Sequence, residues 1–291
     1  MDEHRPVLRR FADGWASRRR RVDEQLAEAV TALERGDRRT ARQLFESAAH
    51  RGSAEAAFDL GLLLEEEGDV DGAMTAYRRA VELGRSAAMS TATPAAMVNL
   101  AVLLSRRGDK EAAMALYRVV ADSDLSELSS LAAFNLGVLL DDAGDPAAAE
   151  AAYRRAVDSG HPDHAATAAV NLGVLLKRAG DVDGARSMYG RVLDGGHPEQ
   201  APRAAFNLGV LLAEAGDVAG ATAAYRRAAD SGHPKYAPMA LVNLGTLLDQ
   251  AGDAEAAEAA FRRAADGGNP DVAARAARAL RRLDSPPESG R

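Results

Sequence analysis

The sequence predicts an all-α protein, a right-handed α-solenoid of about seven helix-turn-helix repeats with a C-terminal closing helix. The dipeptide Gly-Asp recurs seven times, and from Gly108 onward it returns every 36 residues. The segments between these dipeptides carry leucines at helical spacing among alanines, without the alternation typical of strands. A period of this length indicates units that bury their apolar faces only by stacking on one another. The seven dipeptides begin at Gly36, Gly68, Gly108, Gly144, Gly180, Gly216 and Gly252.

One unit is clearest between residues 203 and 234. Phe206, Leu208 and Leu211 recur at helical spacing and predict a first helix. Gly216 can adopt the left-handed conformation that ends this helix, and Asp217 can accept backbone N–H groups as the cap of a second helix. The unit is therefore predicted to be a helical hairpin.

A second break follows each second helix, where a glycine stops one hairpin and a proline starts the next. In one repeat the turn itself reads Asp145-Pro146, which puts proline at the first helical position, where its missing donor costs nothing. The later breaks span residues 159–162, 195–198, 231–234 and 267–270.

Two sets of residues predict close packing between the helices. Small residues stand where helices must approach, and one aromatic residue always stands eight residues after the turn aspartate. An aromatic side chain at a fixed helical offset in every repeat indicates core packing, with its hydroxyl at the edge, more than a ligand platform. The small residues are Gly137, Gly173, Gly209 and Gly245 in first helices and Ala149, Ala185, Ala221 and Ala257 in second helices; the aromatic residues are Phe45, Tyr77, Tyr117, Tyr153, Tyr189, Tyr225 and Phe261.

This combination resembles the tetratricopeptide repeat, and the glycine that closes each unit also resembles the Sel-one-like repeat. The resemblance covers about residues 22–283. It departs in the 36-residue length of most units, where 34 is usual, in the small residue Ala205 at a position that is usually aromatic, and in a displaced closing proline. The residues that carry it are Leu208, Gly209, Gly216, Asp217, Ala221, Tyr225 and Ala228.

Composition predicts an intracellular binding scaffold, cytoplasmic and without a membrane span. The chain has 291 residues and no cysteine, which excludes a disulfide framework and thiolate catalysis. The net charge is −7, yet residues 1–21 hold seven arginines against three acidic residues, so the repeat body is acidic. An acidic body argues against nucleic acid as the main ligand.

The two ends of the chain are expected to differ from the repeats. Residues 1–21 are predicted to be a basic arm or a capping helix, in which Phe11 and Trp15 shield the open end of the first repeat. Residues 284–291, with two prolines and little apolar content, are predicted to be a disordered tail.

No motif of a catalytic site is present, so we expect neither an enzyme nor a cofactor. The histidines His161, His197 and His233 recur once per repeat, about 10 Å apart if each marks a helix layer. One metal ion cannot bridge that distance with bonds of about 2 Å. Asn269 takes the equivalent position in the last repeat, which predicts a helix-capping role for the row and no metal site.

The second helices carry Arg-Arg pairs after the aromatic residue. Asp158, Asp230 and Asp266 stand four residues after Arg154, Arg226 and Arg262, which predicts ion pairs along single helices.

One asparagine in each first helix of repeats three to seven is the candidate peptide-binding set. An amide offers both a donor and an acceptor, as a peptide group does. Layers about 10 Å apart match three residues of extended chain at about 3.3 Å each. In chaperone-adaptor tetratricopeptide domains and in O-linked N-acetylglucosamine transferase, an asparagine just before Leu-Gly contacts the ligand. The resemblance therefore implies a ligand-binding role for the asparagines here. The alternative is that the repeat has a generic preference for asparagine at this position. The set is Asn99, Asn135, Asn171, Asn207 and Asn243.

The sequence thus predicts a scaffold that binds a protein or an extended peptide in its concave groove. Two other functions stay open at this point. One is a structural module that associates with itself, and the other is a regulator that uses its arginine arm on nucleic acid, whose binding would collapse with added salt.

Overall fold

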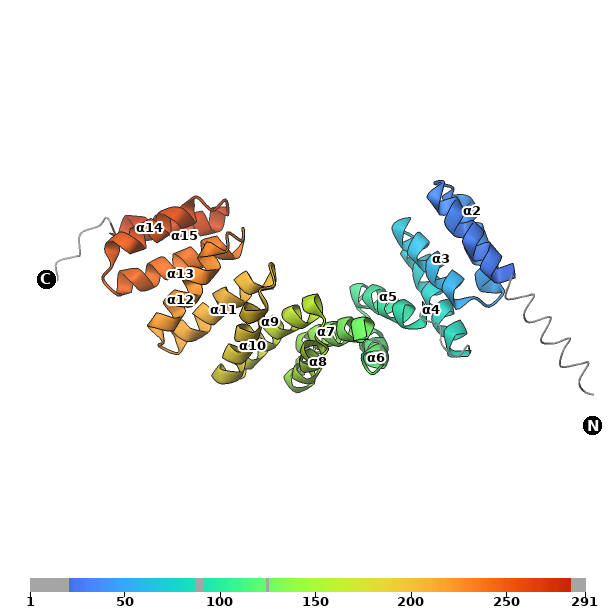
Figure 1. Cartoon of the computed structure of the whole chain (residues 1–291), viewed down its shortest axis with the longest axis horizontal. Helices are drawn as coiled ribbons and strands as arrows, with labels where there is room; N and C mark the ends of the chain where they lie inside the picture. The colour runs from blue at the N-terminus through green and yellow to red at the C-terminus, as the bar shows by residue number, and fades with distance from the viewer. Residues whose placement is uncertain (1–20, 87–91, 124–125, 284–291) are drawn as a thin grey trace, which may run out of the picture. The chain divides into compact units, whose positions relative to one another are not determined.

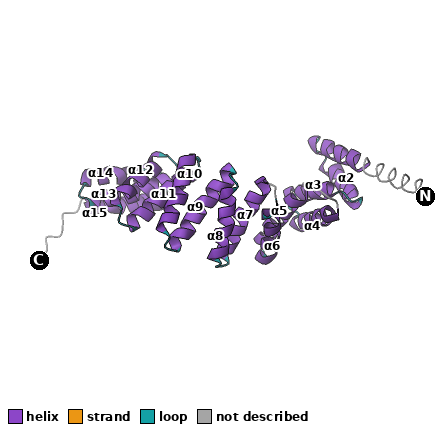
Figure 2. Cartoon of the chain, turned by 60° about the horizontal axis from the view of Figure 1, so that its bottom comes forward, coloured by secondary structure: helices purple, strands orange, loops and turns teal. Residues whose placement is uncertain are grey.

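A computed structural model describes residues 21–86, 92–123 and 126–283 of the protein. Within these ranges every regular element is a helix and no strand occurs (Figure 2). Residues 1–20 of the predicted arm, with Phe11 and Trp15, and the predicted tail at residues 284–291 lie outside the described residues. The chain forms two compact units, Met1–Leu139 and Leu140–Arg291.

Unit 1 alternates first and second helices. Residues 21–34 are helical and precede the first Gly-Asp turn. Each helix from α2 to α5 packs against the next one, and α3 also contacts α5, the first helix of the following repeat. The labelled helices are α2 (Arg38–His50), α3 (Ala54–Glu66), α4 (Val70–Ser86), α5 (Ala92–Arg106), α6 (Lys110–Ala121) and α7 (Ser126–Asp142), within which the first unit ends (Figure 1).

Unit 2 continues the same order. Its first helices α9, α11, α13 and α15 contact one another in sequence, and the second helices α10, α12 and α14 each pack between two of them. This is the layered stacking that the 36-residue period predicts. The helices are α8 (Pro146–Asp158), α9 (Pro162–Arg178), α10 (Val182–Gly195), α11 (Gln200–Glu214), α12 (Val218–Asp230), α13 (Tyr236–Gln250), α14 (Ala254–Ala265) and α15 (Pro270–Leu283) (Figure 1).

The Gly-Asp turns have the predicted conformation. Gly216 has a φ of 80°, in the left-handed region, and the N–H of Asp217 donates to the carbonyl of Leu212 at 2.9 Å. The Asp217 carboxylate then accepts the N–H of Gly220 at 2.9 Å and caps α12. The dipeptide therefore ends one helix and starts the next within two residues.

The aromatic row forms the core of the repeats, as predicted. Tyr189 and Phe261 are 0% exposed, and Tyr225 is 3% exposed. A Cβ atom built on Gly209 of α11 would lie 2.5 Å from Cδ1 of Tyr225 of α12. The small residue of the first helix therefore makes room for the aromatic ring of the second.

The closing helix α15 completes the stack of unit 2. It packs against α13 and α14 through Val272 and Ala276, which are buried. Its four arginines are exposed, so the last helix turns its polar side outward. They are Arg275, Arg278, Arg281 and Arg282.

The predicted ion pairs along the second helices are wrong for Arg154 and Arg262. Arg154 pairs instead with Glu150, and Arg262 with Glu258, in both cases four residues earlier. An acidic residue N-terminal to its basic partner is the better order on a helix, because both charges then oppose the helix dipole.

Two of the aspartates predicted to pair within their own helix, Asp158 and Asp230, connect neighbouring repeats instead. Asp158 lies 3.8 Å from Nη1 of Arg191, and Asp230 lies 3.7 Å from Nη2 of Arg263. Nη2 of Arg191 also donates to the carbonyl of Val157 at 3.2 Å. Nη2 of Arg227 donates to the carbonyl of Leu193 in the same way. The second arginine position of α10, α12 and α14 thus binds the C-terminal end of the preceding second helix, where the helix dipole favours a cation.

Candidate functional site

The five predicted asparagines lie on consecutive first helices, and each is half-buried. Asn99 and Asn135 belong to unit 1, on α5 and α7. The other three belong to unit 2, where their helices contact in sequence. We call the surface around Asn171 (α9), Asn207 (α11) and Asn243 (α13) the asparagine face.

The asparagines bond to the tyrosine row. Nδ2 of Asn99 donates to Oη of Tyr77 at 3.3 Å, and Nδ2 of Asn243 donates to Oη of Tyr225 at 3.3 Å. Each tyrosine comes from the second helix of the preceding repeat. The bond fixes the asparagine amide with its nitrogen toward the core. The Oδ1 atom of the asparagine makes no bond to the tyrosine.

Asn171 has both ends of its amide engaged. It hydrogen-bonds Tyr153 of α8, and its Oδ1 accepts from Nη2 of Arg203 at 2.8 Å. Arg203 lies on α11, one turn before Asn207, and is half-buried. This link crosses from one first helix to the next.

Asn207 differs from its neighbours on the face. Within the described ranges neither Asn207 nor Asn135 has a hydrogen-bond partner. Tyr189 stands 18 residues before Asn207, just as Tyr225 stands 18 residues before Asn243. Its Oη is buried and also lacks a hydrogen-bond partner. The tyrosine–asparagine bond is therefore missing in this layer.

The buried tyrosines stay neutral over the physiological range. Burial raises the pKa of Tyr153 to about 12 and that of Tyr189 to about 12, against an ordinary value of 10.0. For Tyr189 the positive charge of Arg203 acts in the opposite direction, so the two side chains are electrostatically coupled. A neutral hydroxyl keeps both a donor and an acceptor.

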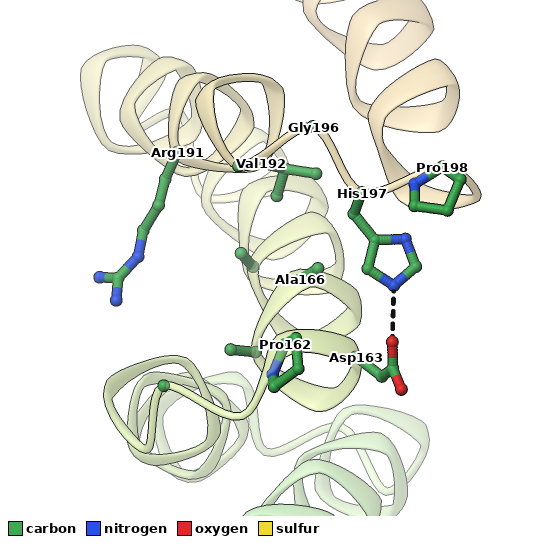
Figure 3. A pocket seen from close by; sticks show the side chains of 12 residues that line it. Pro162, Asp163, Ala166, Arg191, Val192, Gly196, His197 and Pro198 are labelled. Atoms are coloured by element: carbon green, nitrogen blue, oxygen red, sulfur yellow. Dashed lines mark hydrogen bonds and ion pairs between the residues drawn. The ribbon is translucent and has the colours of Figure 1, made fainter.

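The predicted capping role of the histidine row is confirmed. Nδ1 of His197 accepts the N–H groups of Glu199 and Gln200, both at 3.2 Å. Asn269 caps α15 in the same way through its Oδ1. Because Nδ1 of His197 accepts, Nε2 carries the proton, and it donates to Asp163 of α9 at 3.0 Å (Figure 3). Among the described residues no group of three potential metal ligands occurs.

A pocket of about 490 Å³ lies beside this contact, between the start of α9 and the end of α10 (Figure 3). Ala166, Val192 and Pro198 contribute apolar walls, and Arg191 extends along one side. Sequence reasoning did not find this pocket. The available signal was Gly195, which lines the pocket where the equivalent positions of the neighbouring repeats hold a serine.

Family models of the tetratricopeptide repeat match residues 26–88, 100–165, 134–196, 170–235 and 238–263, which is more than half of the chain. The chain belongs to the tetratricopeptide repeat family. Tetratricopeptide proteins generally mediate protein–protein interactions, and the family is typically non-enzymatic. A comparison with curated proteins gives no match.

Solved tetratricopeptide structures share the fold at low sequence identity. The C-terminal part of a repeat protein from Cytophaga hutchinsonii has a TM-score of 0.64 at 15% identity, over 86% of this chain and 98% of that one. PilF of Pseudomonas aeruginosa has a TM-score of 0.56 at 20% identity, over 77% and 97%. YrrB, described as a tetratricopeptide protein with an unusual peptide-binding site, has a TM-score of 0.50 at 21% identity, over 69% and 97%. In the part of our chain that is described, no helix is both long and apolar enough to cross a membrane.

Proposed function

We propose that this protein is an interaction scaffold that binds an extended peptide segment of a partner protein on the asparagine face of unit 2. The observation that carries the proposal is one half-buried asparagine per first-helix layer, at Asn171, Asn207 and Asn243. Layers about 10 Å apart accommodate about three residues of extended chain each.

The tyrosine–asparagine bond supports this role. At Asn243 the tyrosine engages Nδ2 and holds the amide in one orientation. Its Oδ1 can then accept a peptide N–H, and the second Nδ2 hydrogen can be donated to a peptide carbonyl. A side chain that is held in place before binding loses less conformational entropy when the ligand arrives.

Asn99 and Asn135 form a shorter set of the same kind in unit 1. Asn99 is held by Tyr77, as Asn243 is held by Tyr225. We assign these two asparagines to peptide binding as well.

The remaining functional assignments follow from the sequence and the family. The protein acts without a catalytic site or cofactor, and it works in the cytoplasm, which fits a chain with no cysteine. The glycine at the end of each unit relates its repeats to the Sel-one-like subtype. A second copy of the chain is an alternative partner for the same face.

The test uses a peptide recovered by the wild-type protein from a phage-displayed library of random peptides. Asn207→Ala should leave the melting temperature unchanged, because Asn207 makes no internal hydrogen bond. It should weaken binding of the synthetic peptide by about 1–2 kcal/mol, measured by calorimetric titration.

Gln43→Ala is the matched control, because it removes an exposed amide from α2 in unit 1. Unchanged affinity in Asn207→Ala, or an equal loss in Gln43→Ala, would contradict the proposal. Asn171→Ala is a poorer test, since it also releases Arg203 and Tyr153.

A further inference from the structure

Arg203 is the one basic residue at its position on the asparagine face. It stands four residues before Asn207, and the equivalent positions before Asn171 and Asn243 hold Thr167 and Met239. Its half-buried guanidinium lies between α11 and α9, where Nη2 donates to Oδ1 of Asn171 at 2.8 Å. A cation is therefore placed at one layer of the face only.

The charge of Arg203 is not neutralised by a carboxylate. The helices α9, α11 and α13 carry two other basic residues, and both have acidic partners: Lys177 pairs with Glu214 at 2.8 Å, and Arg178 pairs with Asp141. In the described part of the chain Arg203 makes no ion pair, and its acceptor is a neutral amide. A partly desolvated cation with a neutral partner favours the approach of an anion.

Two further polar groups beside Arg203 have unused hydrogen-bonding capacity. The Asn207 amide has no partner among the described residues, and the Tyr189 hydroxyl is buried and unpartnered. Buried polar groups are normally satisfied, so an unpartnered hydroxyl here calls for an explanation. A ligand that fixes the Asn207 amide, or turns it toward Tyr189, would complete the layer.

An acidic residue that acts on Tyr189 is already engaged in an ion pair. Glu214 acts electrostatically on Tyr189, but its carboxylate is held by Lys177. The Glu214 carboxylate is therefore not paired with Arg203, and a carboxylate of a ligand can take the position beside the guanidinium.

We infer that Arg203 is a specificity-determining residue that binds an aspartate or glutamate side chain of the peptide on the asparagine face. The inference rests on the proposed function. The planar guanidinium matches one carboxylate in a bidentate pair. When the carboxylate draws Arg203 away from Asn171, the Oδ1 atom of Asn171 becomes available to a peptide N–H, so acid recognition and backbone recognition are coupled.

The charge of the whole chain favours a carboxylate over a nucleic-acid phosphate. The protein has 43 acidic against 36 basic residues. Nucleic acid requires a row of cations, whereas the asparagine face presents one unpaired guanidinium. A single acidic side chain in an otherwise neutral segment fits that arrangement.

The experiment compares peptides selected from a phage-displayed library of random peptides by the wild type and by Arg203→Gln. Library peptides are joined to the phage through their C-terminus and have no free C-terminal carboxylate. Any preference for acidic residues therefore reflects their side chains. The wild type should enrich aspartate or glutamate at one position of the recovered peptides. Replacing that residue by its amide in a synthetic peptide, with an amidated C-terminus, should weaken wild-type binding at least about tenfold.

The same peptide change should have no effect on binding to Arg203→Gln. Arg186→Gln, on α10, removes an exposed arginine of the same unit and should retain the wild-type preference. Circular dichroism and melting curves establish that both variants fold.

The possible failures are distinguishable. Wild-type peptides without an acidic preference, or a preference that Arg203→Gln retains, would overturn this inference and leave the proposed function standing. Synthetic peptides that bind only with a free C-terminal carboxylate would also overturn it. A selection that recovers no peptide would refute the proposed function, and this inference with it.

Discussion

Replacing Gly209 by alanine tests the fit between the first and second helix of a repeat. A Cβ atom at this position would lie 2.5 Å from Cδ1 and from Cε1 of Tyr225, and 3.0 Å from Cγ. The tyrosine is 3% exposed, and its hydroxyl accepts a hydrogen bond from Asn243. The ring therefore cannot move aside without disturbing both the core and the asparagine face.

Gly190 of α10 provides a matched control in the neighbouring second helix. It is half-exposed, and a Cβ atom there would meet nothing within 4 Å. Both substitutions replace a helical glycine by alanine, which favours the helix by about 1 kcal/mol. Only Gly209→Ala adds overpacking, which typically costs about 1–3 kcal/mol.

Gly190→Ala should accordingly raise the free energy of unfolding by about 0.5–1 kcal/mol. Gly209→Ala should lower it by up to about 2 kcal/mol, because the overpacking exceeds the gain in helix propensity. The difference between the two variants, about 1–3 kcal/mol, isolates the contact with Tyr225.

Urea unfolding followed by far-ultraviolet circular dichroism measures both changes. Repeat arrays can unfold in more than one step, so the comparison should use the transition midpoints and slopes of all variants under one condition. The double variant Gly209→Ala with Tyr225→Leu should show a coupling energy, since the smaller side chain relieves the contact. If Gly209→Ala is as stable as Gly190→Ala, the close fit between glycine and tyrosine is refuted.

Two other predictions concern the caps and the buried hydroxyls. His197→Ala should lower the free energy of unfolding by about 1 kcal/mol, because it removes the cap of α11. His197→Asn should keep most of that stability, since Asn269 caps α15 in the same way. Equal melting temperatures of the two variants would contradict the capping role. Burial raises the pKa of Tyr117, Tyr153 and Tyr189 to about 12 from an ordinary 10.0, so their contribution to stability is complete below about pH 10 and is lost as the pH rises through about 12. Tyrosinate absorbance and helical dichroism should therefore change together in an alkaline titration, and ionisation of all tyrosines near pH 10 with helicity intact would show that they are exposed.

The local features of the repeat could be predicted from the sequence because each depends on residues close together in the chain. Gly216 and Asp217 end one helix and start the next through bonds that reach no further than five residues. The cap made by His197 likewise involves only the next three residues. Composition and spacing suffice for contacts of this range.

The contacts between repeats could not be predicted in the same way. The spacing along one helix predicts that Arg154 pairs with Asp158, yet Asp158 lies near Arg191 of the next second helix. In the sequence the tyrosine and asparagine rows are separate sets, because Tyr225 and Asn243 lie on different helices of neighbouring repeats. Such pairs depend on how far each layer is displaced from the last, and the sequence alone does not give that displacement.

The bonds on the asparagine face separate two explanations of why asparagine recurs there. At Asn243 and Asn99 a structural role is sufficient, because each amide satisfies a buried tyrosine hydroxyl. At Asn207 that explanation fails, since the Tyr189 hydroxyl is buried and has no partner, and Asn207 bonds to nothing else among the described residues. A generic preference for asparagine would be expected to form the same bond in every layer. In the described part of unit 1, Asn135 also lacks the bond. On the asparagine face of unit 2, the layer that lacks it is also the layer that holds Arg203, so the departure from the repeat pattern and the unpaired charge coincide there. A ligand that bonds to Asn207 and pairs with Arg203 would account for both the missing bond and the unpaired charge. The binding experiments should therefore begin at Asn207 and Arg203.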